Sequence, residues 1–323
     1  MKKLLVTLLC ILCTLTPLFA TAQAGAADYP TMPVTALVSW APGGASDLLT
    51  RTIANHFNEF AGQPMIVNNI DGGASVVGVT EYLGYENNAY NVLFWATAQT
   101  IKTQMQVTPY AATDFQAVAS FTFDSPYILV NRESPFETLA DLVEYAKANP
   151  GKLTMGNSGV GGGNHLAALQ FSIAAGIEIN HIPYGGGGAS AQGAMAGEVD
   201  CSMNVPPEGI AQIEAGDLRV LAVLSTERSP FFPDVPTAKE SGYDAVNEQA
   251  RGFVVHKDTD PAIVAKLEEI FKNISEKEEF QKAVADMTMN AMFMNAEEYG
   301  AAIVEEDELY KKIIQENGLG DRY

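Results

Sequence analysis

The segment that decides the fold is Val34-Thr35-Ala36-Leu37-Val38-Ser39-Trp40-Ala41-Pro42-Gly43-Gly44-Ala45-Ser46-Asp47. Its first seven residues are mainly apolar or β-branched, which is typical of a buried strand in a parallel sheet. The run Ala41-Pro42-Gly43-Gly44 breaks this strand, and a segment with the apolar spacing of an amphipathic helix follows. Its apolar residues are Leu49, Ile53, Phe57 and Phe60. A strand, a glycine-rich turn and a helix in this order predict an α/β fold.

The same order recurs along the chain. Further strands are expected at residues 64–70, 91–95 and 153–156, and further helices at 74–85 and 164–175. Capping signals predict further helix boundaries. Helix starts are expected at the capping-box pairs Thr138/Asp141, Ser275/Glu278 and Asn295/Glu298 and at the N-cap Asp260-Pro261. Helix ends are expected at Asn149-Pro150-Gly151 and at Gly318. We interpret Glu305-Glu306-Asp307, on the last helix, as a solvent-exposed face and not as a metal site.

Length and charge narrow the class of protein. The chain has 323 residues, enough for two domains of about 100–200 residues each. It contains 39 acidic and 19 basic residues, for a formal net charge of −20. So acidic a surface repels phosphate backbones, and we expect no nucleic-acid partner. A small anionic ligand is compatible with this composition, because the electrostatic potential at a local site can be opposite in sign to the net charge.

Residues 1–26 have the three parts of a secretory signal peptide. Met1-Lys2-Lys3 is basic, residues 4–15 are mostly apolar, and small residues with Ala-x-Ala sites extend to Ala26. The alternative, a membrane anchor, needs about 20 consecutive apolar residues, and this run is shorter. We expect an exported periplasmic protein from which the signal is cleaved. Cys201 is then the single cysteine, and we expect a buried thiol and not a nucleophile.

Two glycine-rich loops, residues 41–47 and 156–165, each join a strand to a helix. A glycine-rich turn exposes backbone N–H groups, and the helix N-terminus adds partial positive charge. Two such loops at the carboxyl ends of parallel strands would hold opposite sides of one anion. The alternative is that these glycines only form tight turns. A third glycine run, Gly185-Gly186-Gly187-Gly188, follows Tyr184.

Several common chemistries are disfavoured. The second loop lacks the last glycine of a dinucleotide fingerprint and the Gly-Lys-Ser/Thr of a P-loop. Val160 stands where a nucleophile elbow around Ser158 needs glycine. The histidines have no metal-ligand spacing, so we expect neither a metal nor a cofactor. They are His56, His165, His181 and His256.

Two side chains are candidates for ligand contact, and each has a structural alternative. His165 lies in the first turn after the second loop, where it either touches a ligand or packs structurally. Arg251 precedes a strand-like run and either reaches the crevice or lies at a surface or interface. Neither loop contains Lys or Arg, so an anion there would be held by N–H dipoles, hydroxyls such as Ser46 and Ser158, and water.

The chain resembles the solute-binding proteins of tripartite tricarboxylate transporters, the Bug-type periplasmic receptors. The resemblance extends over nearly the whole mature chain. It rests on an ordered series of motifs: residues 29–34, 40–47, 156–161, 165–166, 181–187, 196–200, 221–225, 228–230, 233–237 and 240–242. It implies a two-lobed periplasmic-binding-protein fold, type II-like, with the ligand cleft between the lobes. Lobe 1 would comprise residues 27–125 plus 225–323, and lobe 2 residues 126–224.

The resemblance also implies where the ligand binds. The candidate ligand-binding residues are Trp40, Ala41, Pro42, Gly43, Gly44, Ser46, Asp47, Asn157, Ser158, Gly159, Val160, Gly161, Asn164, His165, Tyr184, Gly185 and Arg251. Two positions depart from the family pattern. Residues 87–91 replace a common Asp-Gly-Tyr-Thr, and Gly185 stands where many members have lysine, which removes a cation near the ligand.

The function implied is that of a non-enzymatic, monomeric receptor. It would capture a small carboxylate, such as a di- or tricarboxylate, and deliver it to a two-subunit membrane permease. One alternative is a sensor that reports its ligand to a membrane kinase. Another is an exported hydrolase using Ser158 and His165, for which the sequence offers no evident acid.

Overall fold

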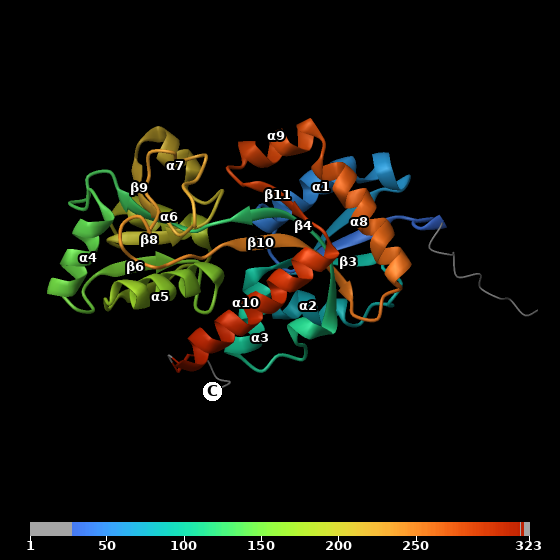
Figure 1. The fold of residues 1–323 in the computed structure, drawn as a ribbon, viewed down its shortest axis with the longest axis horizontal. Coiled ribbons are helices and arrows are strands. Elements are labelled where there is room, and N and C mark those ends of the chain that lie inside the picture. Colours follow the sequence, from blue (N-terminus) through green and yellow to red (C-terminus); the bar gives the residue numbers. More distant parts are fainter. Residues whose placement is uncertain (1–27, 317, 320–323) are drawn as a thin grey trace, which may run out of the picture.

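The chain folds into two lobes, each built on one β-sheet with an apolar core on either face (Figure 1). The computed structural model describes residues 28–316, 318 and 319. The expected signal peptide, residues 1–26, lies outside the described residues. Within the described part of the chain, no helix is long and apolar enough to cross a membrane.

Lobe 1 contains both chain ends of the described region. Its strands are β1 (Val34–Val38), β2 (Met65–Asn69), β3 (Asn91–Ala96), β4 (Phe115–Asp124), β10 (Gln249–His256) and β11 (Ala291–Met294). Its helices are α1 (Ala45–Ala61), α2 (Val76–Tyr82), α3 (Thr97–Met105), the 3-10 turn η2 (Ala112–Asp114), α8 (Pro261–Ser275), α9 (Glu278–Asp286) and α10 (Ala296–Glu316).

Lobe 2 is the middle of the chain. Its strands are β5 (Tyr127–Asn131), β6 (Thr154–Asn157), β7 (Asn180–Pro183), β8 (Cys201–Asn204) and β9 (Leu218–Val223). Its helices are α4 (Leu139–Ala148), α5 (Gly163–Ala175), α6 (Gly187–Ala196) and α7 (Ile210–Ala215).

Both sheets are mixed, which differs from the parallel sheets expected. The strand orders are β11-β4-β10-β3-β1-β2 and β7-β6-β8-β5-β9. In lobe 1, β1 pairs in parallel with β2 and β3, whereas β10 is antiparallel to β3 and β4. In lobe 2, β6 pairs in parallel with β7 and β8, and β5 is antiparallel to β8 and β9. The two main glycine loops therefore follow β1 and β6, each a strand of a parallel portion.

The chain passes twice between the lobes, and the second passage comes later than the expected boundary at residue 225. Phe232 and Val235 pack on one core of lobe 2, and Ala238 and Ala245 belong to the other. The backbone N–H of Asn247 still bonds to the carbonyl of Leu224 in lobe 2. Lobe 2 therefore extends to about residue 247, because the segment after β9 folds back before entering β10.

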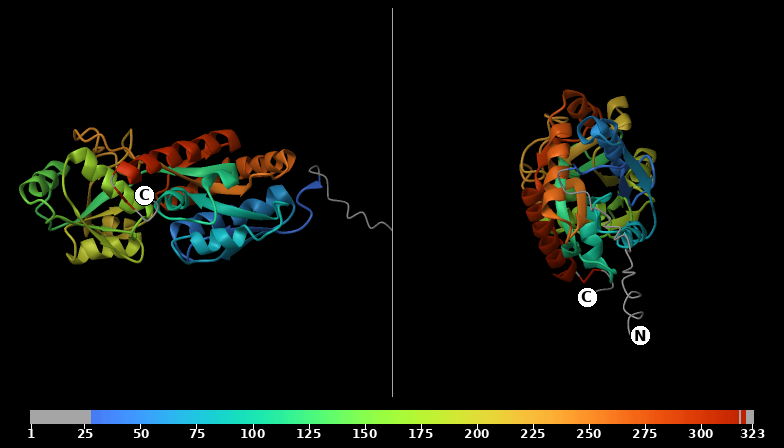
Figure 2. Two further views of the ribbon diagram at one scale, coloured as in Figure 1. Left: turned by 90° about the horizontal axis from the view of Figure 1, so that it is seen from below. Right: turned by 90° about the vertical axis from the view of Figure 1, so that its right-hand side faces the viewer.

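A small apolar core joins the lobes at one side of the junction. Ile101 and Met105 of α3 pack with Leu166 of α5, and Tyr310 and Ile314 of α10 complete the cluster. Figure 2 shows the lobes end to end, with α10 lying along lobe 1 and its C-terminal end at the junction. α3 thus lies in the contact between the two lobes.

Most of the expected helix caps are confirmed. Thr138 and Asp141 form a reciprocal capping box, and Asn295 and Glu298 form another. The N-cap Asp260 accepts from the N–H of Ala262, the second residue of α8. The expected box at Ser275 is wrong. Ser275 is the last residue of α8, and its hydroxyl bonds back to Lys272, so α9 starts without it.

The interpretation of Glu305-Glu306-Asp307 as a solvent-exposed face is wrong for two of its residues. Glu306 and Asp307 are half-buried against α3, where they accept hydrogen bonds from Thr97 (2.5 Å) and Gln104 (2.6 Å). Only Glu305 is exposed. Burial raises the pKa of Glu306 to about 8, although hydrogen bonds and the charge of Arg251 oppose the shift.

We expect Glu306→Gln to change how stability depends on pH. Because the pKa of Glu306 is raised in the folded state, its contribution is complete below its unfolded pKa and is lost as the pH rises toward 8. The amide cannot ionise, so the variant should match the wild type at pH 5 and exceed it at pH 8.5. Discounted for partial exposure, the gain is on the order of 1 kcal/mol. Urea unfolding at both pH values measures it, and equal differences at the two pH values would contradict it.

Candidate functional site

The two glycine loops share their backbone conformation at two consecutive glycines before the helix, although they lie in different lobes. We call residues 40–47, after β1, loop A, and residues 157–165, after β6, loop B. Gly43 and Gly161 both adopt left-handed conformations, with φ of +84° and +72°. The following residues, Gly44 and Gly162, cap α1 and α5 with φ/ψ of −79°/169° and −78°/164°. No side chain caps the start of either helix, so the first-turn N–H groups of α1 and α5 donate no hydrogen bond to a capping side chain.

Each loop is braced by a side chain four residues after its left-handed glycine. In loop A, the N–H of Gly43 donates to Asp47 Oδ2 at 2.8 Å. In loop B, the N–H of Gly161 donates to His165 Nδ1 at 3.1 Å. An acid and an imidazole thus perform the same task at equivalent positions.

Asp47 is the centre of a hydrogen-bond network below loop A. Arg51 forms a salt bridge with it at 2.9 Å, and the amide of Asn69 donates to its Oδ1 at 3.0 Å. The same amide donates to the carbonyl of Trp40. Burial tends to raise the pKa of Asp47, but the hydrogen bonds from Arg51, Gly43 and Asn69 outweigh it and lower the pKa. Asp47 is therefore an ionised brace that holds loop A.

We expect Asp47→Ala to weaken ligand binding at least tenfold, about 1.4 kcal/mol. The change removes the acceptor of Gly43 and one partner of both Arg51 and Asn69, so loop A loses the contact that fixes its conformation. Isothermal titration of the mature chain measures the effect. Asp141→Ala is the matched control, since Asp141 is also a first-turn acid that accepts from the N–H four residues before it, but it lies on α4. Unchanged affinity for a folded Asp47→Ala would reduce Asp47 to a simple helix-start residue.

His165 is neutral in this arrangement. Burial and the neighbouring His181, whose ring centroid is 5.0 Å away, lower its pKa to about 4. Its Nδ1 accepts from Gly161, so the proton of the neutral ring is on Nε2. Nδ1 is then unavailable as a base for Ser158, which argues against the hydrolase alternative.

One buried donor in each loop has no partner among the described residues. They are Nε1 of Trp40 in loop A and Nδ2 of Asn157 in loop B. The other amide atom of Asn157, Oδ1, accepts from the N–H of Gly159 at 3.0 Å, which fixes the side chain. Buried donors are rarely left unpaired. Both suit an acceptor such as a carboxylate oxygen or a bridging water.

The third glycine run already holds a carboxylate of the protein itself. Glu208, after β8, is half-buried, and a Cβ on Gly187 would lie 1.9 Å from its carboxyl group. Its Oε2 accepts from Asn164 at 2.8 Å and from the N–H of Val205 at 3.0 Å. Burial raises the pKa of Glu208, and these bonds oppose the shift. The carboxyl group of Glu208 therefore lies against Gly187 at the start of α6, and Asn164 is committed to Glu208.

Tyr184 and Arg251 have partners away from the loops. The hydroxyl of Tyr184 donates to Glu198, beyond the C-terminal end of α6. Arg251, at the start of β10, is buried and forms an ion pair with Asp124 at the end of β4. Its charge is therefore neutralised within the junction.

The remaining candidates are open to solvent to different degrees. Exposed residues are Ala41, Pro42, Gly43, Gly44, Val160 and Gly185. Half-buried residues are Trp40, Ser46, Ser158 and Gly159. The tips of both loops are thus accessible.

Lys102 is a cation beside loop B that is not among the residues expected from the sequence. It lies on α3 of lobe 1, is half-buried, and has its Nζ 3.6 Å from where a Cβ on Gly161 of loop B would be. The one signal available was that Lys102 is the only charged residue between Glu86 and Asp114. The helix that carries it was not expected, because its sequence is rich in Thr and Gln and has no apolar period.

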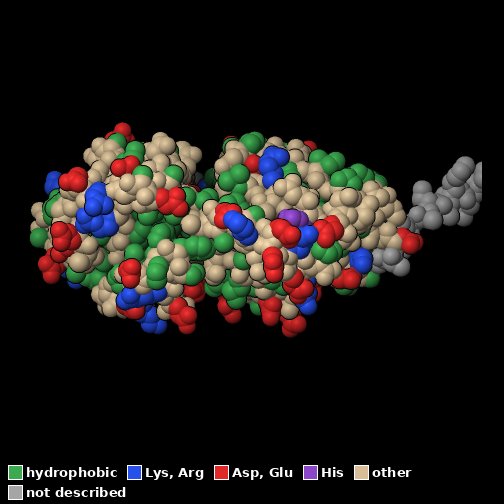
Figure 3. Space-filling view, turned by 90° about the horizontal axis from the view of Figure 1, so that it is seen from above, with side chains coloured by type: hydrophobic (Ala, Val, Ile, Leu, Met, Phe, Trp, Pro, Cys, Tyr) green, Lys and Arg blue, Asp and Glu red, His purple; other side chains and the backbone are tan. Residues whose placement is uncertain are grey.

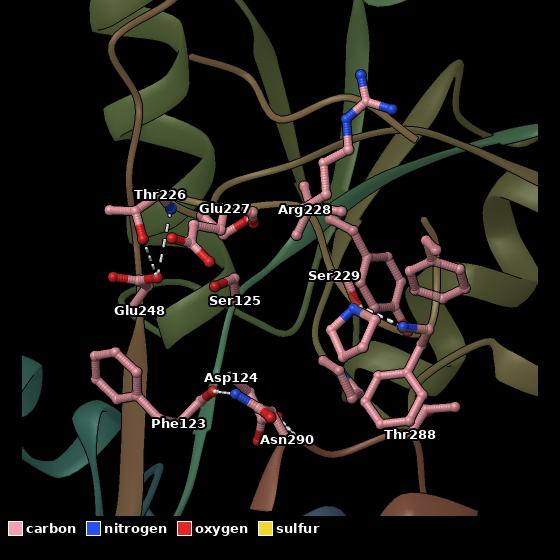
Figure 4. Close-up of a pocket in the computed structure, with 17 residues that line it drawn as sticks. Phe123, Asp124, Ser125, Thr226, Glu227, Arg228, Ser229, Glu248, Thr288 and Asn290 are labelled. Atoms are coloured by element: carbon pink, nitrogen blue, oxygen red, sulfur yellow. Dashed lines mark hydrogen bonds between the residues drawn. The ribbon is translucent and has the colours of Figure 1, made fainter. Parts of the chain in front are cut away.

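A separate cavity of about 220 Å³ lies where the two passages between the lobes meet (Figure 4). Its walls include Phe123, Asp124 and Ser125 from the first passage, residues 225–232 from the segment after β9, and Thr288 and Asn290 from the turn before β11. Neither loop A nor loop B contributes to it. The space-filling view shows the surface notched between the lobes (Figure 3).

The described residues contain no group of three or more His, Cys, Asp or Glu side chains able to hold a metal ion. Cys201 is a free, buried thiol, and burial raises its pKa. The described residues therefore offer hydrogen-bond donors and, near loop B, the ammonium group of Lys102 without a salt-bridge partner among them, which is the chemistry of an anion site.

Two α/β lobes that each present a braced glycine loop at a helix start define a solute-binding protein of the periplasmic type. The chain belongs to the tripartite tricarboxylate transporter receptor family, whose model matches residues 49–319. It is 31% identical to the UPF0065 protein in the gbd 5' region of Cupriavidus necator, covering 92% of this chain and 91% of that protein. It is 27% identical to protein BugT of Bordetella pertussis, covering 92% and 93%.

Solved structures superpose on this chain over most of its length. A periplasmic transporter superposes with a TM-score of 0.81 at 27% identity, covering 90% of this chain and 99% of that one. The R. palustris protein Rpa4515, solved with adipate, superposes with a TM-score of 0.82 at 23% identity, covering 90% and 99%. At that identity the second likeness concerns the fold alone.

Proposed function

We propose that the mature protein is a periplasmic receptor that captures a small carboxylate between loops A and B and delivers it to a two-subunit membrane permease. The observation that carries the proposal is the pair of matched loops, one in each lobe, at uncapped helix starts. Backbone N–H groups there are fixed by Asp47 and His165, so they are already oriented for an anion.

The energetics are adequate for a transport receptor. A micromolar Kd corresponds to about −8 kcal/mol. Charge-assisted hydrogen bonds contribute about 1.5–3 kcal/mol each, so a few from both loops, less the cost of ordering and closure, supply it. The net charge of −20 does not oppose this, because N–H dipoles and Lys102 set the local field.

A ligand bound to a protein of the same fold is a precedent for the class of ligand. A protein of the same fold holds adipate, a dicarboxylate. Another protein of this fold, MatC of Rhodopseudomonas palustris, was solved with bound malate. Malate and adipate are therefore suitable first probes for this chain.

A thermal-shift screen of the mature chain tests the proposal. The panel contains mono-, di- and tricarboxylates, acidic amino acids, neutral sugars and divalent metals. At 100 times its Kd, a ligand adds about 2.7 kcal/mol of apparent stability. We expect stabilisation by carboxylates. Stabilisation only by sugars or metals, or by no member of the panel, would overturn the proposal.

A further inference from the structure

α3 connects the base of loop A with loop B. β3 and β1 are parallel neighbours, so α3 starts beside the loop that follows β1. Near its start, Nε2 of Gln99 donates to Oγ of Ser39 at 3.1 Å, and Ser39 directly precedes Trp40. Three residues further along α3, Lys102 lies beside Gly161 of loop B, as does Met105.

Lys102 differs from the other cations near the site. Arg51 is paired with Asp47, and Arg251 with Asp124. Among the described residues, no salt bridge or hydrogen bond engages Nζ of Lys102, and burial lowers its pKa. A half-buried ammonium without an anion is unfavourable, and an incoming carboxylate at loop B would relieve this cost.

We infer that Lys102 is the specificity-determining residue that makes the site prefer ligands with two carboxylates. One carboxylate would bind the N–H groups of loop A, and the second would lie between loop B and the ammonium group of Lys102. This inference rests on the proposed function.

The position of Lys102 gives it a second consequence. The lysine belongs to lobe 1 and loop B to lobe 2, so a carboxylate bound between them contacts both lobes. Gly185, in lobe 2, has no side chain that could supply this charge. A ligand with a single carboxylate at loop A gains nothing from Lys102.

The experiment compares ligands that differ by one charge. Malate, adipate and the monoamide of each are titrated calorimetrically into the wild type, Lys102→Met and Lys102→Arg. We expect Lys102→Met to weaken the better dicarboxylate at least tenfold and its monoamide less than threefold. Lys102→Arg should restore most of the affinity. Raising the salt concentration should weaken dicarboxylate binding more in the wild type than in Lys102→Met.

Lys147→Met is the matched control, since Lys147 is exposed on α4 and should leave both affinities unchanged. Methionine preserves the apolar stem of Lys102, and thermal unfolding checks that the variant is folded. Equal losses for dicarboxylate and monoamide, or Lys102→Met within twofold of the wild type, would overturn the inference while leaving the proposed function in place. If no carboxylate binds the wild type, the proposed function fails, and the inference fails with it.

Discussion

Replacing Arg251 with methionine is expected to destabilise the protein by about 3–5 kcal/mol. Arg251 and Asp124 are buried, with side chains 5% and 1% exposed, and they join β10 to β4 where the chain passes between the lobes. Without the guanidinium, Asp124 keeps a buried carboxylate with no cation. Glu208 and Glu306 also lose the positive charge that opposes the rise in their pKa.

Urea unfolding at pH 7 measures this effect. Arg228→Met is the control, because Arg228 and Glu240 form an exposed pair with side chains 46% accessible, and we expect at most about 1 kcal/mol there. The double variant Arg251→Met/Asp124→Asn should recover part of the loss, since it removes the uncompensated charge. An Arg251→Met variant within 1 kcal/mol of the wild type would show that the pair does not stabilise the junction.

Gly161→Val is expected to weaken ligand binding at least 100-fold, about 2.7 kcal/mol. Gly161 has φ of +72°, a conformation that a β-branched residue rarely adopts. A Cβ there would lie 3.2 Å from Cε of Met105 and 3.6 Å from Nζ of Lys102. Relief of this strain would displace the N–H that bonds to His165 and push Lys102 away from loop B.

Calorimetric titration with the best ligand of the screen measures the loss, and circular dichroism verifies the fold. Gly188→Val is the matched control, because Gly188 is exposed and a Cβ there meets nothing within 4 Å. We expect its affinity to stay within threefold of the wild type. Equal affinities of Gly161→Val and wild type would remove loop B from the site.

Much of the local structure could be predicted from the sequence because its causes are short-range. The β-branched run before Trp40 and the apolar spacing after Asp47 gave β1 and α1 correctly. Capping pairs such as Thr138/Asp141 are satisfied within four residues, so their partners are visible in the sequence. The wrong box at Ser275 shows the limit, since α8 includes that residue and its hydroxyl bonds back to Lys272.

The residue patterns alone determined the α/β class and the two glycine loops, because strands, turns and helix starts depend on neighbouring residues. The two-lobed architecture was implied by the resemblance to the receptor family. Only the tertiary structure decided which polar groups are paired within the protein and which are available to a ligand. Glu208 fills the third glycine run from 21 residues away, and Asp124 neutralises Arg251 across 127 residues. Lys102 meets loop B from the other lobe. Such pairings depend on how distant segments pack, and burial then makes an unpaired charge costly enough to determine its partner.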